Sequence, residues 1–345
     1  MKRLIDLFAG AIALWLALWR LVGDANGWLA LANAWAFWLL LKGIPLGTVA
    51  LWRRSRALAV LWAVGAGTMF VQRYGPLLRR IFAPTPAQPI AGDKLRVVSS
   101  NLLNEARNLD ETAQAILALD ADVVLFQECI QSHCEQLEPS LREAYPHRAW
   151  VPYLPSNMGL GVVSRIPFAV TGIWQDIGLE PYALRLAMAL PNGPLDVYCI
   201  HFISPNHQIR RFGPTRLLRT REQQIRTVLQ EIQRHPRPAI VAGDWNSTEG
   251  ADSYRRTAAQ LVDGWIEGGV GAGWTWQRLL FGQDVPPLLR LDYLFHTGRS
   301  RSRPVQVTKM RSVVDPQVGS DHCPIVADLI VASASRSAEI STESE

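Results

Sequence analysis

The chain has 345 residues, of which 48% are hydrophobic and 19% charged, so it can bury a substantial core. This composition excludes a disordered chain and a small disulfide scaffold. The formal net charge of +5 suits a polyanionic partner. The four cysteines include no CxxC pair and no Cys/His run at zinc spacing, which argues against a structural zinc site. Seven of the thirteen tryptophans lie before residue 63, which argues against a soluble single-domain protein.

Three apolar blocks near the N-terminus predict three membrane-spanning helices. The first block, residues 4–22, has the length needed to cross a hydrocarbon core of roughly 30 Å. The second, residues 28–52, is interrupted by Lys42 and Pro45, and the third covers residues 57–71. A cleavable signal peptide is the alternative for the first block. No small-residue cleavage site follows that block, however, and apolar sequence resumes after a short loop.

Basic residues near the ends of these blocks predict the orientation of the helices, because positive charges resist translocation and stay cytoplasmic. A cytoplasmic N-terminus places one group on that side, namely Lys2, Arg3, Lys42, Arg53, Arg54 and Arg56. The loop at residues 23–27 carries no basic residue and would lie outside. Three spans then place the C-terminal domain of this multi-pass cell-membrane protein outside the cytoplasm. Arg73, Arg79 and Arg80 oppose this orientation, unless they anchor the chain at lipid phosphates.

The chain divides into four parts by composition. Residues 1–75 form the membrane anchor, and residues 76–93 are rich in proline and predict a short extended linker. From residue 94 to residue 331, strand-like apolar runs alternate with helical runs, which is typical of a mixed α/β domain. Residues 332–345 are small and polar without apolar periodicity, and they predict a disordered tail.

Polar residues that can bind a metal or move a proton follow six apolar runs of this domain. They are Asn101 and Asn104, Glu128, His201, Asp244 and Asn246, Asp292, and Asp321 with His322. One strand often ends in Asp or Asn simply to turn the chain, but six such endings indicate a site. Carboxylate and amide oxygens suit a hard divalent cation such as Mg²⁺. Histidines suit acid/base catalysis or the stabilisation of charge on a phosphorane.

Two of these endings are motifs, Gly243-Asp244-Trp245-Asn246 and Ser320-Asp321-His322-Cys323-Pro324. Three weaker elements fall in the same order, at residues 127–128, 161–165 and 290–293. With them, the domain resembles the endonuclease/exonuclease/phosphatase superfamily, whose deoxyribonuclease I-like fold is a four-layered α/β sandwich. The layout of membrane spans followed by this domain is similar to a membrane-anchored bacterial subgroup linked with glycopeptide-antibiotic resistance.

The resemblance implies three groups of site residues. The metal, Mg²⁺ or its substitute Mn²⁺, would be held by Asn101, Glu128 and Asp321. Catalysis would depend on His201, Asp244, Asn246, Asp292 and His322. The substrate would be contacted by Asn104, Arg165 and Asn246. A base that activates water could be either Asp244 or a histidine, and the resemblance leaves this open.

Some of these residues also have purely structural interpretations. Asn104 could cap or turn the chain, Asp292 could pair with Arg290, and His201 could be a packed histidine at a strand end. The structural interpretation is weak for Glu128, Asp244, Asp321 and His322, because a buried carboxylate without a metal or a donor is costly. Cys129 and Cys134 are close enough in sequence for a disulfide in an exported domain, but we expect buried or free thiols.

The expected function is that of a membrane-anchored, divalent-metal-dependent phosphoesterase that cleaves a phosphodiester or pyrophosphate bond. Anchoring beside lipid headgroups favours a lipid-linked or extracytoplasmic substrate. The arginines between residues 210 and 226 suit a nucleic acid or a solvated helix face, so an endonuclease or exonuclease acting on DNA or RNA is the alternative. An inactive membrane scaffold is the least favoured reading, because no ligand position is missing. The expected partners are membrane lipids and the phosphoester, and no protein partner can be inferred.

Overall fold

The computed structural model describes most of the chain. The described residues are 2–82, 90–103, 108–153, 159–176, 180–204, 212–276, 279–280, 283–298, 304–314 and 319–333. Of the residues predicted to form the site, Asn104 lies outside these ranges. The predicted disordered tail also lies almost entirely outside them.

The chain forms two compact units. The helical unit comprises Met1–Ala83, Ser204–Gln223 and Ser247–Arg256. The sandwich unit comprises Pro84–Ile203, Gln224–Asn246 and Thr257–Glu345. The sequence predicted a single boundary within residues 76–93. Two further segments of the predicted catalytic domain nevertheless belong to the helical unit, because they contact its helices.

The helical unit contains four N-terminal helices and parts of two later ones. They are α1 (Lys2–Val22), α2 (Gly27–Ala34), α3 (Ala36–Trp52), α4 (Arg56–Phe82), the first part of α8 (Pro214–Arg234) and most of α9 (Asp252–Ala258). The Asn26 side chain caps α2 by accepting hydrogen bonds from the next turn. Pro45 lies inside α3 and Pro76 inside α4, so neither proline breaks its helix. The extended linker predicted from residue 76 therefore does not begin there.

The predicted set of three membrane-spanning helices is not supported. The second predicted span is two helices, α2 and α3, which are bent by 76° at Trp35. Among the described residues, no single helix is both long and apolar enough to cross a membrane. The bent pair of α2 and α3 meets the criterion of length and composition only when the two are taken together.

Polar contacts join the N-terminal helices to the two later segments of the helical unit. Asp24 and Asp252 are linked reciprocally, since the backbone N–H of each donates to the other's carboxylate, at 3.0 and 2.6 Å. The backbone N–H of Gly27 donates to Thr215 Oγ1 at 3.1 Å, and the Arg73 guanidinium donates to the Gly250 carbonyl. The helices and the segments at residues 204–223 and 247–256 therefore form one packed body.

The sandwich unit contains two six-stranded mixed sheets. The first sheet has the order β13-β14-β1-β2-β4-β3, with β1 (Gly92–Asn101), β2 (Val123–Gln127), β3 (His147–Val151), β4 (Leu160–Ser164), β13 (Val305–Ser312) and β14 (Ile325–Ala332). The second has the order β5-β6-β7-β8-β12-β9, with β5 (Phe168–Gln175), β6 (Pro181–Leu190), β7 (Gly193–His201), β8 (Ala239–Asp244), β9 (Val262–Asp263) and β12 (Asp292–His296). A separate short hairpin pairs β10 (Leu279–Leu280) with β11 (Gln283–Asp284).

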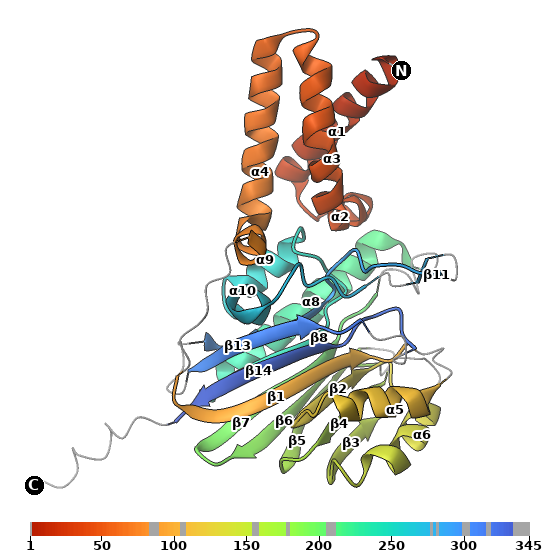
Figure 1. Ribbon diagram of the computed structural model, residues 1–345, viewed down its shortest axis with the longest axis vertical. Helices are drawn as coiled ribbons and strands as arrows, with labels where there is room; N and C mark the ends of the chain where they lie inside the picture. Colours follow the sequence, from red (N-terminus) through yellow and green to blue (C-terminus); the bar gives the residue numbers. More distant parts are fainter. Residues whose placement is uncertain are drawn as a thin grey trace, which may run out of the picture. The chain divides into compact units, whose positions relative to one another are not determined.

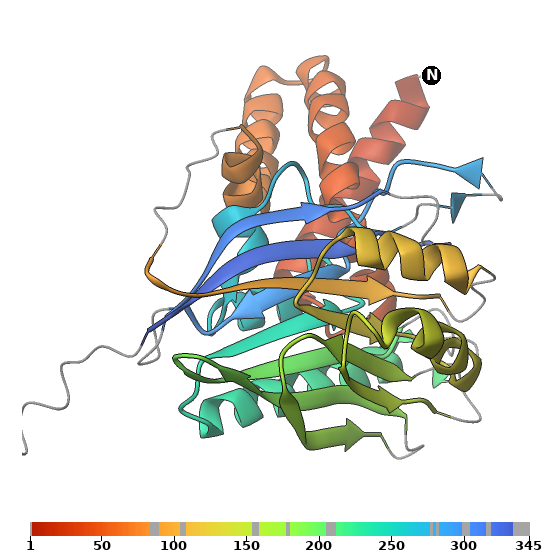
Figure 2. The same cartoon turned by 60° about the horizontal axis from the view of Figure 1, so that its bottom comes forward.

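The two sheets stack on each other, with helices on their outer faces (Figures 1 and 2). Buried apolar residues of α5 (Leu109–Ala118) and α6 (Gln131–Leu141) pack against the first sheet. The second half of α8 (Pro214–Arg234) lies against the second sheet, where Glu231 pairs with Arg185 at 2.9 Å. α10 (Gly264–Gly268) packs beside β12 and β13. This order of helix, sheet, sheet and helix is the four-layered α/β sandwich that the resemblance implied.

Strands buried on both faces explain the continuous apolar runs of the sequence. All five residues of β2 are buried, as are all six of β8. Across the interface between the sheets, the Cys199 thiol of β7 lies 3.6 Å from the Phe126 carbonyl oxygen of β2. The central strands of both sheets are thus fixed by the core, and the residues that follow them are held at defined positions.

Candidate active site

Strand register places three of the predicted site residues in one row across the second sheet. β8 lies between β7 and β12, and Asp244 at its end is the register partner of both His201 and Asp292. In the first sheet, Asn101 at the end of β1 is the register partner of Gln127, and Glu128 follows directly. In both sheets, polar site residues therefore lie at or directly after the ends of the central strands.

Asn101 joins the two sheets at this point. Its Nδ2 donates a hydrogen bond to Glu128 Oε1 and another to Asp244 Oδ2, both at 3.1 Å. The amide is oriented because its Oδ1 accepts from the Leu103 backbone N–H at 2.9 Å. Asn101, Glu128 and Asp244 are all buried. Two carboxylates from different sheets therefore face the same amide group in the interior of the sandwich.

His201 lies beside the same two carboxylate oxygens. Its Nε2 is 3.9 Å from Glu128 Oε1 and 3.8 Å from Asp244 Oδ2. The side chain is only 1% exposed. The structure therefore brings His201 into the cluster, beyond hydrogen-bond distance of either carboxylate.

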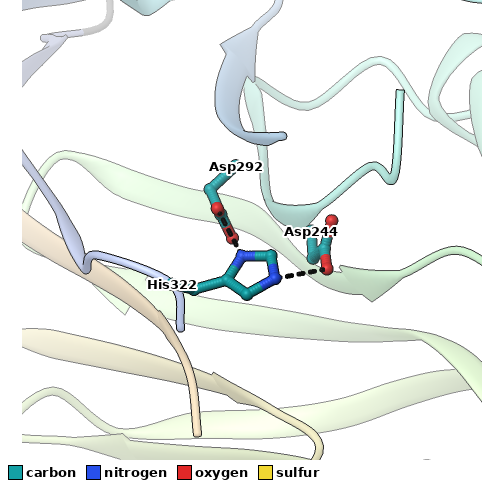
Figure 3. Close-up of side chains that lie close together, drawn as sticks. All are labelled: Asp244, Asp292 and His322. Carbon is teal, nitrogen blue, oxygen red and sulfur yellow. Dashed lines mark hydrogen bonds and ion pairs between the residues drawn. The ribbon is translucent and has the colours of Figure 1, made fainter. Parts of the chain in front are cut away.

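His322 lies between Asp292 and Asp244, as Figure 3 shows. Its Nδ1 is 2.8 Å from Asp292 Oδ2, and its Nε2 is 3.7 Å from Asp244 Oδ2. A carboxylate that accepts from Nδ1 fixes the imidazole ring and leaves Nε2 directed toward the reacting groups. Arg290, the partner that the structural interpretation offered for Asp292, forms a buried ion pair with Asp263 at 2.6 Å.

Burial and neighbouring charges shift the pKa values of this pair. Burial disfavours the imidazolium form of His322, but the carboxylates of Asp292 and Asp244 outweigh burial and raise the His322 pKa to about 10. Burial also raises the pKa of Asp244 to about 7, although His322 opposes this shift. In the metal-free protein, His322 is therefore a cation at neutral pH.

Thr275 positions both members of the pair, and the sequence analysis did not single it out. Its Oγ1 accepts hydrogen bonds from the backbone N–H groups of Leu291 and Asp292, each at 3.2 Å. Its carbonyl oxygen accepts from the backbone N–H of Cys323 at 2.7 Å. The only local signal is the polar residue within the run Trp274-Thr275-Trp276, which gives no indication of these long-range contacts.

The turn after β8 has the backbone that its motif requires. Gly243 has φ +147°, and a Cβ at this position would clash with the Ile200 carbonyl. Asn246 adopts a left-handed backbone with φ 48°, and its backbone N–H donates to Asp244 Oδ1 at 2.8 Å. Its Nδ2 also donates to Asp244 Oδ2 at 3.2 Å and to the Phe202 carbonyl at 2.9 Å. The motif thus holds the Asp244 carboxylate from its own turn.

Glu128 adopts a left-handed backbone as well, with φ 56°. This conformation is uncommon for a residue with a long side chain and persists where the surrounding structure imposes it. The neighbouring Cys129 N–H donates to the Gly159 carbonyl at 3.0 Å, which holds the turn. The backbone strain therefore falls at a residue whose carboxylate faces Asp244 across Asn101.

Two predicted site residues have other contacts. The Asp321 carboxylate accepts a hydrogen bond from Trp276 Nε1 at 3.1 Å. It is therefore not one of the two carboxylates that Asn101 contacts, which are Glu128 and Asp244.

Arg165 is exposed and pairs with Asp120 at 2.6 Å. It follows β4, which is antiparallel to β2, so it lies at the opposite end of the sheet from Glu128. The structure therefore does not bring Arg165 to the cluster, where its predicted contact with the substrate would have to be made.

Comparison with known families accounts for this geometry. The sequence profile described as the Endonuclease/Exonuclease/phosphatase family matches residues 96–322, which is more than half of the chain. The chain belongs to the endonuclease/exonuclease/phosphatase family. It is therefore a hydrolase that acts on ester bonds, which argues against the hypothesis of an inactive membrane scaffold. A comparison with curated protein sequences gives no significant match.

Solved structures with this fold include proteins of several kinds. An endonuclease/exonuclease/phosphatase from Bacteroides vulgatus is 16% identical with a TM-score of 0.56, covering 69% of this chain and 99% of that one. Beta toxin from Staphylococcus aureus is 18% identical with a TM-score of 0.53, covering 68% and 99%. D. rerio TDP2 in complex with a single-strand DNA product is 20% identical with a TM-score of 0.52, covering 69% and 99%. Because all three sequences are less than 25% identical to this chain, the similarity shows a shared fold and not a shared substrate.

Endonuclease/exonuclease/phosphatase enzymes depend on a divalent metal ion, and the cluster fits one. Glu128 and Asp244 would repel each other when both are ionised, and a divalent cation between oxygen donors removes that cost. Asp244, Asp292 and His322 also offer ligand atoms within 4.8 Å of one another. Asp292 accepts from His322, so Glu128 and Asp244 are the carboxylates of the cluster that could hold the ion, and Asn101 Nδ2 orients both of them.

Proposed function

We propose that this protein is a membrane-associated, Mg²⁺-dependent phosphoesterase that cleaves a phosphodiester or pyrophosphate bond of a lipid-linked, extracytoplasmic substrate. One observation carries the lipid part of this proposal. Of the 22 large hydrophobic side chains that are exposed in the described residues, 17 lie in residues 7–82. Soluble proteins rarely expose so much apolar surface in one region, and such surfaces contact membranes or partners.

Each residue of the cluster would have a separate role in catalysis. Glu128 and Asp244 would hold the cation, and Asn101 would orient both carboxylates. When bound, the cation would act as a Lewis acid on the phosphoryl oxygen. Asn246 would keep the Asp244 carboxylate in place for the attacking water. His322, oriented by Asp292, would donate a hydrogen bond from Nε2 to a phosphoryl oxygen and so stabilise the negative charge of the transition state. His201 would contact the same group from the opposite side of Asp244.

The sidedness of the catalytic unit is part of the proposal. The basic residues before α1 and between α3 and α4 favour a cytoplasmic location for those segments. This proposal requires α4 to cross the membrane, which would place the catalytic unit outside the cytoplasm, where it would meet lipid-linked or extracellular phosphoesters. Nucleotides of the cytosol would be excluded as substrates by the membrane.

Nucleic acid is the alternative substrate, and the similarity to TDP2 with its single-strand DNA product motivates it. The arginines of α8 give this alternative partial support, because Arg216, Arg219 and Arg226 are exposed. Arg221 of the same helix is buried. Part of this positive charge therefore serves the internal packing of the helical unit.

The decisive experiment is a substrate panel with the full-length protein in detergent micelles. Polyprenyl pyrophosphate, phospholipid, sphingomyelin, linear DNA and RNA would each be incubated with Mg²⁺, with Mn²⁺ and with EDTA. We expect metal-dependent release of phosphate or headgroup from a lipid, and loss of that activity in Glu128→Gln. Cleavage of DNA or RNA alone, at the same enzyme concentration, would replace the lipid proposal with the nuclease alternative.

A further inference from the structure

The helical unit contains a pocket of about 520 Å³ that lies away from the catalytic cluster in sequence and belongs to no site described above. Its wall is formed by one face of α4 and by the second half of α1. Small and apolar side chains line much of it, namely Leu16, Ala17, Ala66 and Met69. Its polar lining includes three arginines, Arg20, Arg73 and Arg255.

Small residues create the space. Gly65 lines the pocket, and a Cβ added there would meet no atom within 4 Å. Larger side chains at Gly65 would therefore enter the pocket without disturbing the helix backbone. Gly67 has equally open surroundings but does not line the pocket. The two glycines of α4 thus provide a matched pair for testing the pocket.

The charges of the three arginines are only partly compensated. Arg255 pairs with Asp252, and Arg73 lies 3.8 Å from the same carboxylate and 4.2 Å above the Trp19 ring. Among the described side chains, no carboxylate pairs with Arg20. Arg73 and Arg255 therefore share the Asp252 carboxylate, and the positive charge of the pocket lining exceeds the negative charge paired with it.

We infer that this pocket binds a lipid that carries a terminal phosphate. Guanidinium groups match phosphate oxygens in charge and geometry, and Thr68 and Gln72 add further polar groups to the lining. The apolar wall suits the first part of a hydrocarbon chain. Exposed Leu61 and Val64 of α4 lie next to the pocket residues in sequence and extend the apolar surface. This inference does not depend on which ester the catalytic cluster cleaves.

The test measures binding of fluorescent phosphatidic acid to the full-length protein in detergent micelles with EDTA, which suppresses hydrolysis. Unlabelled phosphatidic acid, phosphatidylcholine and inorganic phosphate serve as competitors. We expect phosphatidic acid to compete at least tenfold better than phosphatidylcholine, and inorganic phosphate to compete weakly. Equal competition by phosphatidylcholine would overturn the inference, and so would strong competition by inorganic phosphate, which would indicate a free-anion site.

Single substitutions can show whether phosphatidic acid binds in this pocket. Gly65→Leu fills the pocket and Arg20→Gln removes the cation without a carboxylate partner, so each should weaken phosphatidic acid binding about tenfold or more. Gly67→Leu should bind as the wild type does, and the thermal unfolding of all three should show that they fold. Unchanged binding in Gly65→Leu, or equal loss in both glycine variants, would overturn the assignment of the lipid to this pocket.

A second inference concerns Cys129 and Cys134 of the sandwich unit. Both are buried free thiols in the structure, as the sequence analysis expected, and their Sγ atoms are 3.1 Å apart. Cys129 directly follows Glu128, and Cys134 lies in the first turn of α6. We propose that the two thiols form a disulfide in the exported protein. This bond would tie the turn that carries Glu128 to α6.

The oxidation is a two-electron step. Each thiol loses its proton, one S–S bond forms, and two electrons pass to a disulfide of an oxidoreductase, which becomes a dithiol. Because both sulfur atoms are buried in the folded unit, the exchange would take place during folding, while they are accessible.

The test counts thiols in full-length protein taken from membranes, denatured without reductant and alkylated. We expect two of the four cysteines to react, and all four after reduction. In Cys129→Ser the three remaining cysteines should react without reductant, whereas in Cys323→Ser only one should. Alkylation of all four cysteines in the unreduced wild type would overturn the proposal.

Discussion

Asn101 of the first sheet donates a hydrogen bond of 3.1 Å to Asp244 of the second. The same nitrogen atom donates to Glu128, which follows β2 of the first sheet. The catalytic cluster is therefore assembled only when the two sheets pack against each other. Its geometry depends on the sandwich core, in which the Cys199 thiol of one sheet contacts the Phe126 carbonyl of the other.

Glu128→Gln should abolish metal-supported turnover without unfolding the protein, because it removes one charged oxygen donor and keeps the side-chain volume. Turnover of the best substrate at saturating Mg²⁺ and circular dichroism would measure the two effects. Arg165→Gln is the control, since Arg165 lies at the other end of the sheet and should leave turnover near the wild-type value. Near-wild-type turnover of Glu128→Gln would contradict the metal assignment.

His322→Ala should lower kcat by a factor on the order of 10² or more, which is typical of a positioned acid/base or charge-stabilising group. Asp292→Asn should lower kcat less, because it orients His322 rather than contacting the substrate. The double variant should be little worse than His322→Ala alone. If its defect equals the product of the two single defects, the residues do not act as a pair.

Thr275→Val should lower kcat as well as stability. It preserves side-chain shape but leaves two buried backbone N–H groups without their acceptor, at a cost of about 1–3 kcal/mol each. Thr297→Val is matched to it, because Thr297 Oγ1 accepts from Ala239 N–H at the opposite end of β8 from Asp244. Both variants should unfold at lower temperature, and only Thr275→Val should lose turnover. Equal turnover in the two variants would remove Thr275 from the positioning role.

The stability of the metal-free protein should fall as the pH rises from 7 to 10. The folded-state pKa of His322 is raised to about 10, above the unfolded value near 6.5. Its stabilising contribution is therefore fully present below the unfolded pKa and is lost as the pH rises through the folded pKa. Melting temperatures in EDTA across this range would show the decline, and His322→Gln should flatten it. An unchanged pH dependence in His322→Gln would contradict the charged state of His322.

The sidedness of the catalytic unit can be measured with a cysteine at Ser337, in a protein whose native cysteines are replaced by serine or alanine. A membrane-impermeant thiol reagent applied to intact cells should label this cysteine if the unit lies outside the cytoplasm. A cysteine at Ser55, between α3 and α4, should be labelled only after lysis. The reverse pattern would place the catalytic unit in the cytoplasm and favour the nuclease alternative.

Much of the catalytic cluster could be predicted because it depends on short-range patterns. An apolar strand followed by Asp, Asn, Glu or His is visible in the sequence, and the core places such strand ends together. Arg165 shows the limit of this reasoning. It also follows an apolar run, but β4 runs antiparallel to β2, and strand direction cannot be read from local sequence. Asp321 precedes His322 in an irregular segment, where neighbouring side chains point to different partners.

The helix boundaries were harder to predict than the strands. Pro45 and Pro76 are the expected helix breakers of this region, yet both lie inside helices. The chain instead bends at Trp35, in a largely apolar run whose one polar residue near the bend is Asn33 and which has no glycine or proline there. The break follows from packing within the helical unit, where buried Ala36, Leu40 and Trp19 belong to one cluster. Such contacts between distant residues leave no local signal in the sequence.

The reciprocal bonds between Asp24 and Asp252 have a practical consequence for anyone who shortens this protein. Residue 252 lies only a few positions after the turn that carries Asn246, and residue 215 lies at the start of the helix that follows His201. A fragment that begins at β1 would lack Asp24, Gly27 and Arg73, and so the partners of both segments. The N-terminal helices therefore belong to the same packed unit as residues 204–223 and 247–256, and fragments that begin at β1 should be poorly folded around those two segments.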